Sequence, residues 1–426
     1  METIIQPQAH VQVVEDLKSI LNQDPDLQNR LIASLQKARD QARANLNKDL
    51  YHAIDNTFEE NGWPVTIEAY YDYIEKYVRL IPNESNDPNY PHAWKSNDQR
   101  NGYNQKVYDL LCQFYYLIDQ QDDQGQTMQS NEDFAEWLVE FARAWGSFLD
   151  TEESLTTESL QSFKRDRMYN FHLYSDSQPG WKTFNNFFYR EFNGSAPETG
   201  ITPLRPIADP DNNTTIVSPA DCTYKMQYNI DDSGNVVHTD GRNARITLKH
   251  THTIGTVKEL LDQSEYADDF NGGTFVHYFL SPFDYHRFHT PVSGKVLDIK
   301  PVVGKVYLNV NISGDQFDAP DGGENGYEFV QARGMVIIDA GGQVGKVAIL
   351  PIGMCQVSGV DMYTNLKGQN VLKGQEFGKF RFGGSDIIML FQKNPGLFLF
   401  KKDPGHTPIH FQYGQAAAYW NLQNEQ

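Results

Sequence analysis

The sequence predicts an α+β protein, in which a helical N-terminal domain (1–158) precedes a compact β-rich domain (159–426). Apolar residues recur at helical spacing in the first part, whereas short β-rich runs separated by glycine follow from about Thr202. The change of hydrophobic period marks the domain boundary. With 426 residues, 39% hydrophobic and 13% aromatic, the chain is long and apolar enough to fold around a sizeable core.

The helical part contains three stripes of apolar residues, each expected to face a core. The spacings of three, four and seven place the residues of one stripe on one helix face. The stripes are Val14, Leu17 and Leu21; Leu27, Leu31 and Leu35; and Phe134, Trp137, Leu138, Phe141, Trp145 and Phe148. Tyr70–Leu80 and Val107–Ile118 show a similar pattern. Loops are predicted at Asn83–Gln105 and at Gln120–Asp133, which has little to bury, with a linker at Asp150–Glu158.

Six short runs in the second part predict strands, because each is rich in β-branched or aromatic residues and is bounded by turn residues. They are Thr215–Val217, Thr274–Leu280, Lys295–Ile299, Met335–Asp339, Val344–Leu350 and Ile387–Phe391. Val257–Leu261 is expected to form a short helix.

Charge and composition exclude several classes of protein. The net charge of −20 opposes binding to nucleic acid or an anionic bilayer, and no basic patch is visible. No stretch approaches the about 20 apolar residues of a membrane span, and Met1–Asp40 lacks a signal-peptide pattern, so a cytoplasmic protein is expected. Cys112, Cys222 and Cys355 are expected to be reduced, mostly buried thiols rather than a disulfide framework or a Cys-pair zinc site.

The segment Asp284–Gly294 concentrates side chains that can do chemistry. His286 and His289 flank Arg287, and two histidines three residues apart could divide two proton transfers or share a metal. No carboxylate or cysteine ligands complete a metal site nearby, so no metal is expected. Two histidines satisfied on a loop would be the better interpretation if the cluster stood alone. The acidic segment Asp318–Glu324 lacks the ligand pattern of an EF-hand and is expected to be a solvated loop.

A serine near the C-terminus provides a second candidate. Ser385 follows two glycines and precedes the apolar run Ile387–Phe391. Spacing alone favours a glycine-containing β-turn over a nucleophile, and the Gly-x-Ser-x-Gly elbow of hydrolases is absent.

Together these segments resemble the phosphatidylserine decarboxylase family, whose pyruvoyl-dependent members carry a Tyr-His-Arg-x-His motif and a late Gly-Ser self-cleavage site. Further segments agree with the family's Phe-Phe-x-Arg, its Arg-Pro-Ile, its Pro-Ala-Asp-Gly and its run into the cleavage site. They are Phe184–Arg190, Arg205–Ile207, Ser218–Asp221 and Lys373–Phe380. The order and spacing of these segments over about Gly180–Phe391 make the resemblance specific.

Two departures from the family pattern point to one branch. The usual Leu-Gly-Ser-Thr is Phe382-Gly383-Gly384-Ser385 here, and Cys222 replaces the glycine after Pro-Ala-Asp. A Gly-Gly-Ser site, together with a helical N-terminal extension that contains Trp145–Leu149, is similar to the fungal L-tryptophan decarboxylase branch. That branch acts on a soluble amino acid.

The resemblance implies a chemistry in two stages. In the first, Ser385 Oγ attacks the carbonyl of Gly384, the peptide becomes an ester, and elimination leaves a dehydroalanine that hydrolyses to a pyruvoyl group and ammonia. His289 is implied as the general base and Asp221 as the residue that orients it. The resulting chains, 1–384 and 385–426, are expected to stay associated.

In the second stage the amine of the substrate forms a Schiff base with the pyruvoyl carbonyl, which accepts electrons as carbon dioxide leaves. His286 is implied as the residue that returns the proton, although either histidine could reach. From the residues alone Asp221 could be a turn residue, and Arg190 is interpreted as structural.

The sequence is compatible with three functions. The first is a pyruvoyl-dependent decarboxylase of a soluble L-amino acid, preferably an aromatic one such as tryptophan. The second is a phosphatidylserine decarboxylase that makes phosphatidylethanolamine, which an amphipathic membrane-docking helix would favour, although none is visible. The third is a non-catalytic binding protein with the same fold, which would not need Asp221, His286, His289 and Ser385 together. A small-molecule substrate, no nucleic acid and no stable membrane insertion are expected, and homo-oligomers remain possible.

Overall fold

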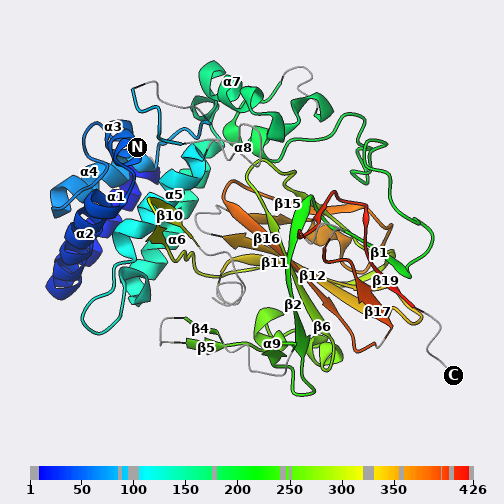
Figure 1. The fold of residues 1–426 in the computed structure, drawn as a ribbon. Coiled ribbons are helices and arrows are strands. Elements are labelled where there is room, and N and C mark those ends of the chain that lie inside the picture. The colour runs from blue at the N-terminus through cyan, green and yellow to red at the C-terminus, as the bar shows by residue number, and fades with distance from the viewer. Residues whose placement is uncertain are drawn as a thin grey trace, which may run out of the picture. The chain divides into compact units, whose positions relative to one another are not determined.

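The computed structural model confirms an α+β architecture that divides into two compact units (Figure 1). The helical unit comprises the described residues within Met1–Phe171, Pro179–Phe187 and Lys305–Pro320, and the β-rich unit comprises the remainder. The described residues are 9–84, 89–94, 105–174, 180–239, 246–248, 252–319, 331–354, 359–394, 396–402 and 407–421.

The helical unit is built mainly from seven described helices, several of which begin at a side-chain cap. They are α1 (Ala9–Gln23), α2 (Pro25–Asn45), α3 (Lys48–Thr57), α4 (Ile67–Tyr77), α5 (Lys106–Ile118), α6 (Glu132–Leu149) and α7 (Thr157–Arg165). The side chain of Asp24 accepts the Leu27 N–H at the start of α2, where Pro25 occupies the first turn. Such caps satisfy backbone donors that have no partner within the helix and thereby fix where each helix starts.

The predicted apolar stripes form the core of this unit. Every residue of the three stripes is buried except Phe148, which is half-buried. In the aromatic centre of the core, the ring of Tyr77 packs against Phe114, Phe141 and Trp145 at centroid distances of 4.9, 5.8 and 5.3 Å. The indole of Trp137 also donates to the carbonyl of Val13 (2.8 Å), which ties α6 to α1.

The expectation that Gln120–Asp133 has little to bury is wrong. Met128 and Gln129 lie in a one-turn 3-10 helix, Met128–Ser130, and both are buried. Gln129 Nε2 donates to Asp119 (2.9 Å) and to the carbonyl of Leu308 (2.9 Å). Leu308 lies in a segment of the helical unit that is far from Gln129 in sequence. The same segment forms a hairpin of β9 (Asn311–Ser313) and β10 (Gln316–Asp318). Local periodicity cannot reveal such a partner.

The β-rich unit is organised around a large antiparallel sheet with the order β14-β8-β11-β12-β16-β6-β2-β18, in which β3 also pairs with β2. Its strands are β2 (Cys222–Ile230), β3 (Val236–Val237), β6 (Thr274–Leu280), β8 (Gly294–Val302), β11 (Arg333–Asp339), β12 (Lys346–Met354), β14 (Asn370–Val371), β16 (Gly384–Phe391) and β18 (His410–Phe411). One face carries a continuous apolar core that includes Phe275, Ile337, Leu350 and Ile388.

Smaller sheets complete this unit. Two have three strands each, in the orders β13-β15-β7 and β1-β19-β17, and one is the pair β4-β5. Their strands are β1 (Thr215–Val217), β4 (Ile246–Leu248), β5 (His252–Ile254), β7 (Arg287–His289), β13 (Val360–Met362), β15 (Glu376–Phe380), β17 (Leu397–Leu399) and β19 (Ala416–Trp420). Helix α9 (Val257–Leu260) occupies the predicted short helix, and α8 (Phe184–Phe188) lies where the two units meet in sequence.

All six predicted strands are present, two of them with the predicted bounds and the others shifted or extended at their ends. Strand β2 was not predicted, although its residues alternate between buried and less buried positions, with Cys222, Tyr224, Tyr228 and Ile230 buried. Cys112 and Cys222 are buried thiols as expected, whereas Cys355 lies outside the described residues. Most of the expected loop Asp318–Glu324 also lies outside them.

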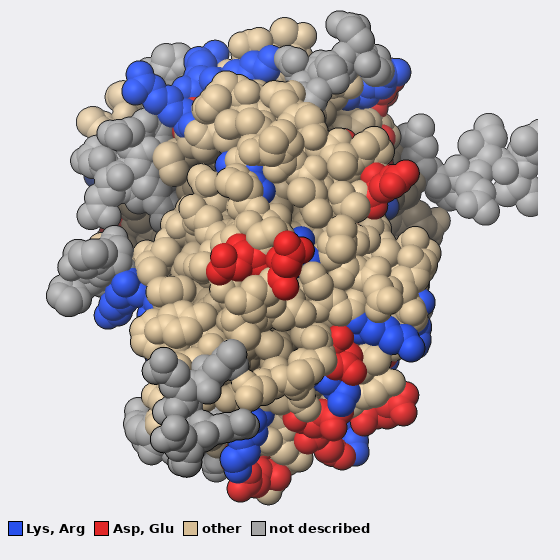
Figure 2. All heavy atoms as spheres, turned by 90° about the vertical axis from the view of Figure 1, so that its right-hand side faces the viewer, with Lys and Arg blue, Asp and Glu red and all other residues tan. Residues whose placement is uncertain are grey.

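On the face shown in Figure 2, acidic and basic side chains are scattered among other residues, and a small acidic group lies near the centre. Among the described helices, none is both long and apolar enough to cross a membrane. The described residues also contain no group of three or more potential metal ligands.

Candidate active site

Ser385 lies at the beginning of β16, in the interior of the large sheet. Its backbone pairs with Gly353 of β12 on one side and with Leu280 of β6 on the other. The residue is fully buried, and its Oγ has no hydrogen-bond partner within the described structure. A buried hydroxyl without a partner is costly, and such atoms in native proteins often mark reactive positions. Gly383, two residues before it, has a φ of 150°, which glycine adopts far more readily than other residues.

His286 lies just before β7 and packs against aromatic rings. Its imidazole stacks on Phe188 with ring centroids 3.9 Å apart, and Phe188 in turn meets Phe382 edge-on at 5.1 Å. Nε2 lies 3.3 Å from the carbonyl of Pro282, so Nε2 carries the proton, since a carbonyl only accepts. Nδ1 therefore holds a lone pair, and it has no partner among the described residues.

His289, the last residue of β7, has the opposite tautomer. Its Nδ1 lies 2.8 Å from the carbonyl of Gly374 and must carry the proton, which leaves the lone pair on Nε2. The hydroxyl of Tyr285 lies 3.3 Å from that Nε2. The ring of Tyr413 stacks on the imidazole with centroids 3.8 Å apart. The contact with Gly374 thus presents Nε2 of His289 as the basic atom.

Burial keeps both imidazoles neutral. Desolvation lowers the pKa of His286 to about 3, helped by the positive charge of Arg190. Desolvation also lowers the pKa of His289 to about 3. The hydrogen bond to Gly374 and the charge of Asp221 raise this pKa, but by less than desolvation lowers it. At neutral pH each ring can therefore accept a proton at one defined nitrogen.

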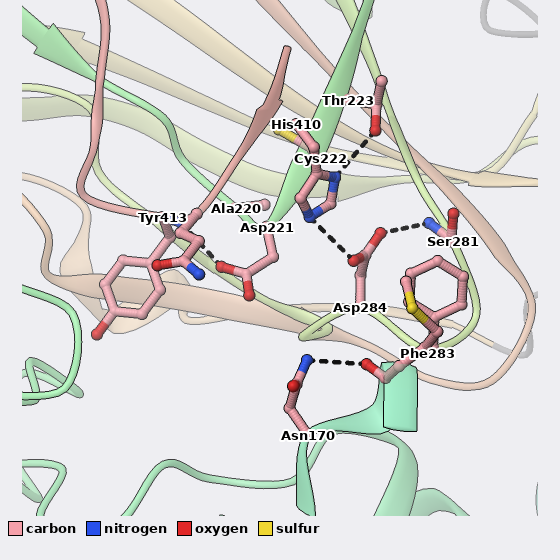
Figure 3. A network of polar contacts seen from close by, with 12 residues as sticks. Asn170, Ala220, Asp221, Cys222, Thr223, Ser281, Phe283, Asp284, His410 and Tyr413 are labelled. Atoms are coloured by element: carbon pink, nitrogen blue, oxygen red, sulfur yellow. Dashed lines mark hydrogen bonds and ion pairs between the residues drawn. The ribbon is translucent and has the colours of Figure 1, made fainter. Parts of the chain in front are cut away.

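Asp221 precedes β2 and acts on His289 indirectly. Its Oδ2 accepts from Arg205 Nη2 (2.9 Å). Its Oδ1 accepts the backbone N–H of Tyr413 (2.8 Å), as Figure 3 shows. No hydrogen bond joins Asp221 to His289 among the described residues. Instead, the carboxylate holds Tyr413, whose ring covers His289, and its charge reaches the imidazole through space.

The turn that carries His286 is held by a separate polar network, also drawn in Figure 3. The carboxylate of Asp284 accepts the N–H of Ser281 at 2.7 Å and lies 3.3 Å from Nε2 of His410. The buried guanidinium of Arg190 donates to the carbonyls of Phe283 (2.7 Å) and Asp284 (3.1 Å). Since Ser281 follows Leu280, the β6 partner of Ser385, this network fixes the backbone that leads from the serine's neighbour to His286.

The arginine between the two histidines, Arg287, forms hydrogen bonds within the protein. Arg287 donates to Glu376 (2.7 Å), to Glu191 (2.6 Å) and to the carbonyl of Tyr189 (2.8 Å). The hydroxyl of Tyr363 donates to the same oxygen of Glu376. These contacts lock β7 against β15, the strand that leads into the Gly-Gly-Ser turn.

The β-rich unit thus contains all the candidate residues. His286 precedes β7 and His289 is its last residue. Sequence reasoning overlooked Tyr413, which no motif singles out, and gave no role to Tyr285 or Arg205. The latter two lie inside recognised segments, so their positions could have been noted. Arg190 is structural, as expected, because its guanidinium binds backbone carbonyls.

Comparison with known proteins adds independent information. The sequence pattern of the family described as phosphatidylserine decarboxylase matches residues 184–418, which is more than half of the chain. The chain is 34% identical over 215 residues to phosphatidylserine decarboxylase proenzyme 3 of Schizosaccharomyces pombe, covering 50% of this chain and 19% of that protein. It is 30% identical over 237 residues to the phosphatidylserine decarboxylase proenzyme of Fusobacterium nucleatum, covering 56% of this chain and 69% of that protein.

A third relative carries a different name. The L-tryptophan decarboxylase of Psilocybe cubensis is 26% identical over 226 residues, covering 50% of this chain and 47% of that protein. The chain therefore spans less than two thirds of several relatives. The family match over residues 184–418 includes His286, His289 and Ser385. From this match and the arrangement of those residues, the chain belongs to the phosphatidylserine decarboxylase family.

Proposed function

We propose that this chain is a pyruvoyl-dependent decarboxylase that cleaves itself between Gly384 and Ser385 and then acts on a soluble L-amino acid. An aromatic amino acid such as tryptophan is the preferred substrate. The observation that carries the proposal is the Ser385 hydroxyl, which is buried and unpartnered at the family's cleavage position. The two neutral histidines supply the bases that the chemistry needs.

Self-cleavage uses only groups of the chain. Ser385 Oγ gives its proton to Nε2 of His289 and bonds to the carbonyl carbon of Gly384, and the C–N bond breaks to leave an ester and a free amine. A base then removes the Cα proton of Ser385, and the Gly384 carboxylate departs. Because nucleophile and carbonyl belong to neighbouring residues, alignment rather than nucleophilicity controls the rate.

The residues around Ser385 fit a pyruvoyl group derived from it. The position is enclosed and desolvated, and Nδ1 of His286 is a second buried atom without a partner. A pyruvoyl group supplies an electron sink for the charge left by departing carbon dioxide. Nδ1 of His286 would accept a proton from the ammonium group of the substrate and deliver it where the carboxylate is lost, and Phe188 and Phe382 would exclude water around it.

Two observations favour an aromatic amino acid over a lipid. Phe188 and Phe382 pack next to His286, and aromatic rings beside a reacting group suit contact with an aromatic side chain. The relative from Psilocybe cubensis is named for tryptophan. Other relatives are named phosphatidylserine decarboxylases, so conversion of phosphatidylserine to phosphatidylethanolamine is the second candidate.

The cleavage is tested by electrophoresis and intact mass of the purified chain. We expect two pieces, 1–384 and 385–426, that remain associated under native conditions. The small piece should be lighter by one ammonia than a serine-terminated peptide and should resist stepwise N-terminal sequencing. The Ser385→Ala variant should stay whole, and a wild-type chain that also stays whole after long incubation would overturn the proposal.

The substrate is tested with the cleaved protein. The standard amino acids in buffer and phosphatidylserine vesicles are offered in parallel, and carbon dioxide release is measured. We expect release from aromatic amino acids without detergent or lipid. Release from vesicles alone would establish the lipid reaction, and release from neither by fully cleaved protein would leave only a non-catalytic role.

A further inference from the structure

The residue directly after Ser385 forms a polar pair inside the sheet. Asp386 Oδ2 lies 3.2 Å from Nε2 of His277 on β6, and both side chains are fully buried. In the register of β16 and β6, Asp386 lies opposite Phe279 and His277 lies opposite Ile388, so the two residues are diagonal neighbours. Burying such a pair costs more than burying apolar side chains of similar size, so its presence calls for an explanation.

The pair lies on the face of the sheet opposite to Ser385. Side chains alternate between faces along a strand, so Asp386 shares a face with Ile388 and Leu390, which belong to the large apolar core. His277 shares that face with Phe275, another member of the core. Ser385 shares the other face with Ile387 and Met389. The polar pair therefore lies within an otherwise apolar core.

Apolar patterning cannot fix the register of β16. The five residues that follow Asp386, Ile387–Phe391, are all apolar, so both faces of the strand are equally suited to burial. A slip of one residue would replace apolar contacts by apolar contacts, with no penalty from hydrophobic burial. The same slip would break the diagonal contact between Asp386 and His277 and leave both polar groups in the core.

We propose that the His277–Asp386 pair specifies the register of β16 and thereby the face on which Ser385 lies. The inference rests on the proposed cleavage at Gly384–Ser385. A slip of one residue would turn Ser385 from its present face towards the apolar core. A slip of two residues would keep the face but move the hydroxyl by about 7 Å along the strand. His277 and Asp386 are thus positioning residues for the cleavage.

The experiment separates positioning from stability. In the double variant His277→Leu/Asp386→Val, the pair is replaced by apolar residues that suit the core. We expect this variant to resist urea at least as well as wild type, because an apolar replacement of a buried pair is often neutral or stabilising. We expect cleavage to be slower by about a hundredfold, as misplacement of a reacting group predicts. Time-resolved gels and intact mass measure the cleavage.

Two variants that retain a polar contact should restore cleavage. Asp386→Asn keeps a hydrogen-bonding group opposite His277, and the exchanged pair His277→Asp/Asp386→His keeps both partners. We expect both to cleave within about tenfold of wild type. Met389→Leu, on the other face of β16 and of similar volume, is the matched control and should cleave normally.

Each outcome decides the inference. A stable double apolar variant that cleaves at the wild-type rate overturns it. If that variant does not fold, the exchanged pair decides: a folded exchanged pair that fails to cleave overturns the inference, and one that cleaves supports it. An uncleaved wild-type chain would instead refute the proposed function, because the register pair acts only on a chain that can cleave.

Discussion

The phenol ring of Tyr413 lies flat against the imidazole of His289, with centroids 3.8 Å apart and planes inclined by 6°. The backbone N–H of the same tyrosine donates to Asp221 at 2.8 Å. One residue therefore links the acid and the base that the family resemblance pairs directly. Tyr413 also belongs to the piece 385–426, so after cleavage it would hold the two chains together at the site.

Removal of the Tyr413 ring should slow self-cleavage. Tyr413→Leu leaves space beside His289, which can then tilt and admit water, and we expect at least about tenfold slower cleavage. Tyr413→Phe retains the stacking and the backbone donor and should cleave at nearly the wild-type rate. Gels sampled over time measure both variants, and equal rates for Leu and Phe would show that the ring does not position the imidazole.

The two histidines should be separable by step. His289→Ala removes the base whose Nε2 holds a lone pair that can take the Ser385 proton once the Tyr285 hydroxyl gives way, and this variant should remain uncleaved. His286→Ala should still cleave, at least partly, but should release little amine product. Cleavage is followed by mass and turnover by carbon dioxide release. Normal cleavage of both variants would contradict the assignment of roles, and Gln at either position tests whether ring size alone matters.

Loss of Arg205 should lower stability and slow self-cleavage, because Arg205 neutralises Asp221. Arg205→Met leaves the buried carboxylate of Asp221 without its cation, which typically costs about 3–5 kcal/mol in the free energy of unfolding. We also expect slower cleavage, because Asp221 would no longer hold the backbone of Tyr413. Arg39, whose pair with Asp40 is exposed, provides the control, and Arg39→Met should change neither property measurably.

The sequence predicted most elements of the fold because their signals are local. Local apolar patterns alone predict which residues are buried in two elements. They are the stripe of α6 from Phe134 to Trp145 and the apolar run of β16. Gln129 could not be placed in a core, since its partner Leu308 lies far away in sequence. Strand β2 was not predicted, although apolar and polar residues alternate along Cys222–Ile230, a local signal that could have identified it.

For the site, residue identity was predictable and contact geometry was not. Ser385, His286 and His289 stood out through short motifs, whereas the hydrogen bond from His289 to Gly374 depends on how β7 lies next to the turn before β15. The sequence favoured a direct contact between Asp221 and His289. The fold instead turns the carboxylate of Asp221 towards Arg205 and the Tyr413 backbone, a choice set by tertiary packing.

The buried histidines should make stability depend on pH below neutrality. In the folded chain the pKa of each imidazole is lowered to about 3 because burial penalises the charged form, whereas an unfolded histidine titrates near 6.5. Between these values the unfolded state binds more protons, so stability is fully present above pH 6.5 and falls as the pH drops towards 3. At about pH 5 each histidine should cost about 2 kcal/mol relative to about pH 7.5.

The Ser385→Ala variant is suited to this measurement because it keeps the chain whole. Urea unfolding of this variant at the two pH values gives the total change, and adding His286→Gln or His289→Gln should each reduce that change by about 2 kcal/mol. Burial raises the pKa of the carboxyl groups of Glu84 and Asp109, whose effect on stability has the opposite sign. That effect is common to all three proteins and cancels in the comparison. An unchanged pH dependence after removal of either histidine would mean that its imidazole is not held neutral by burial.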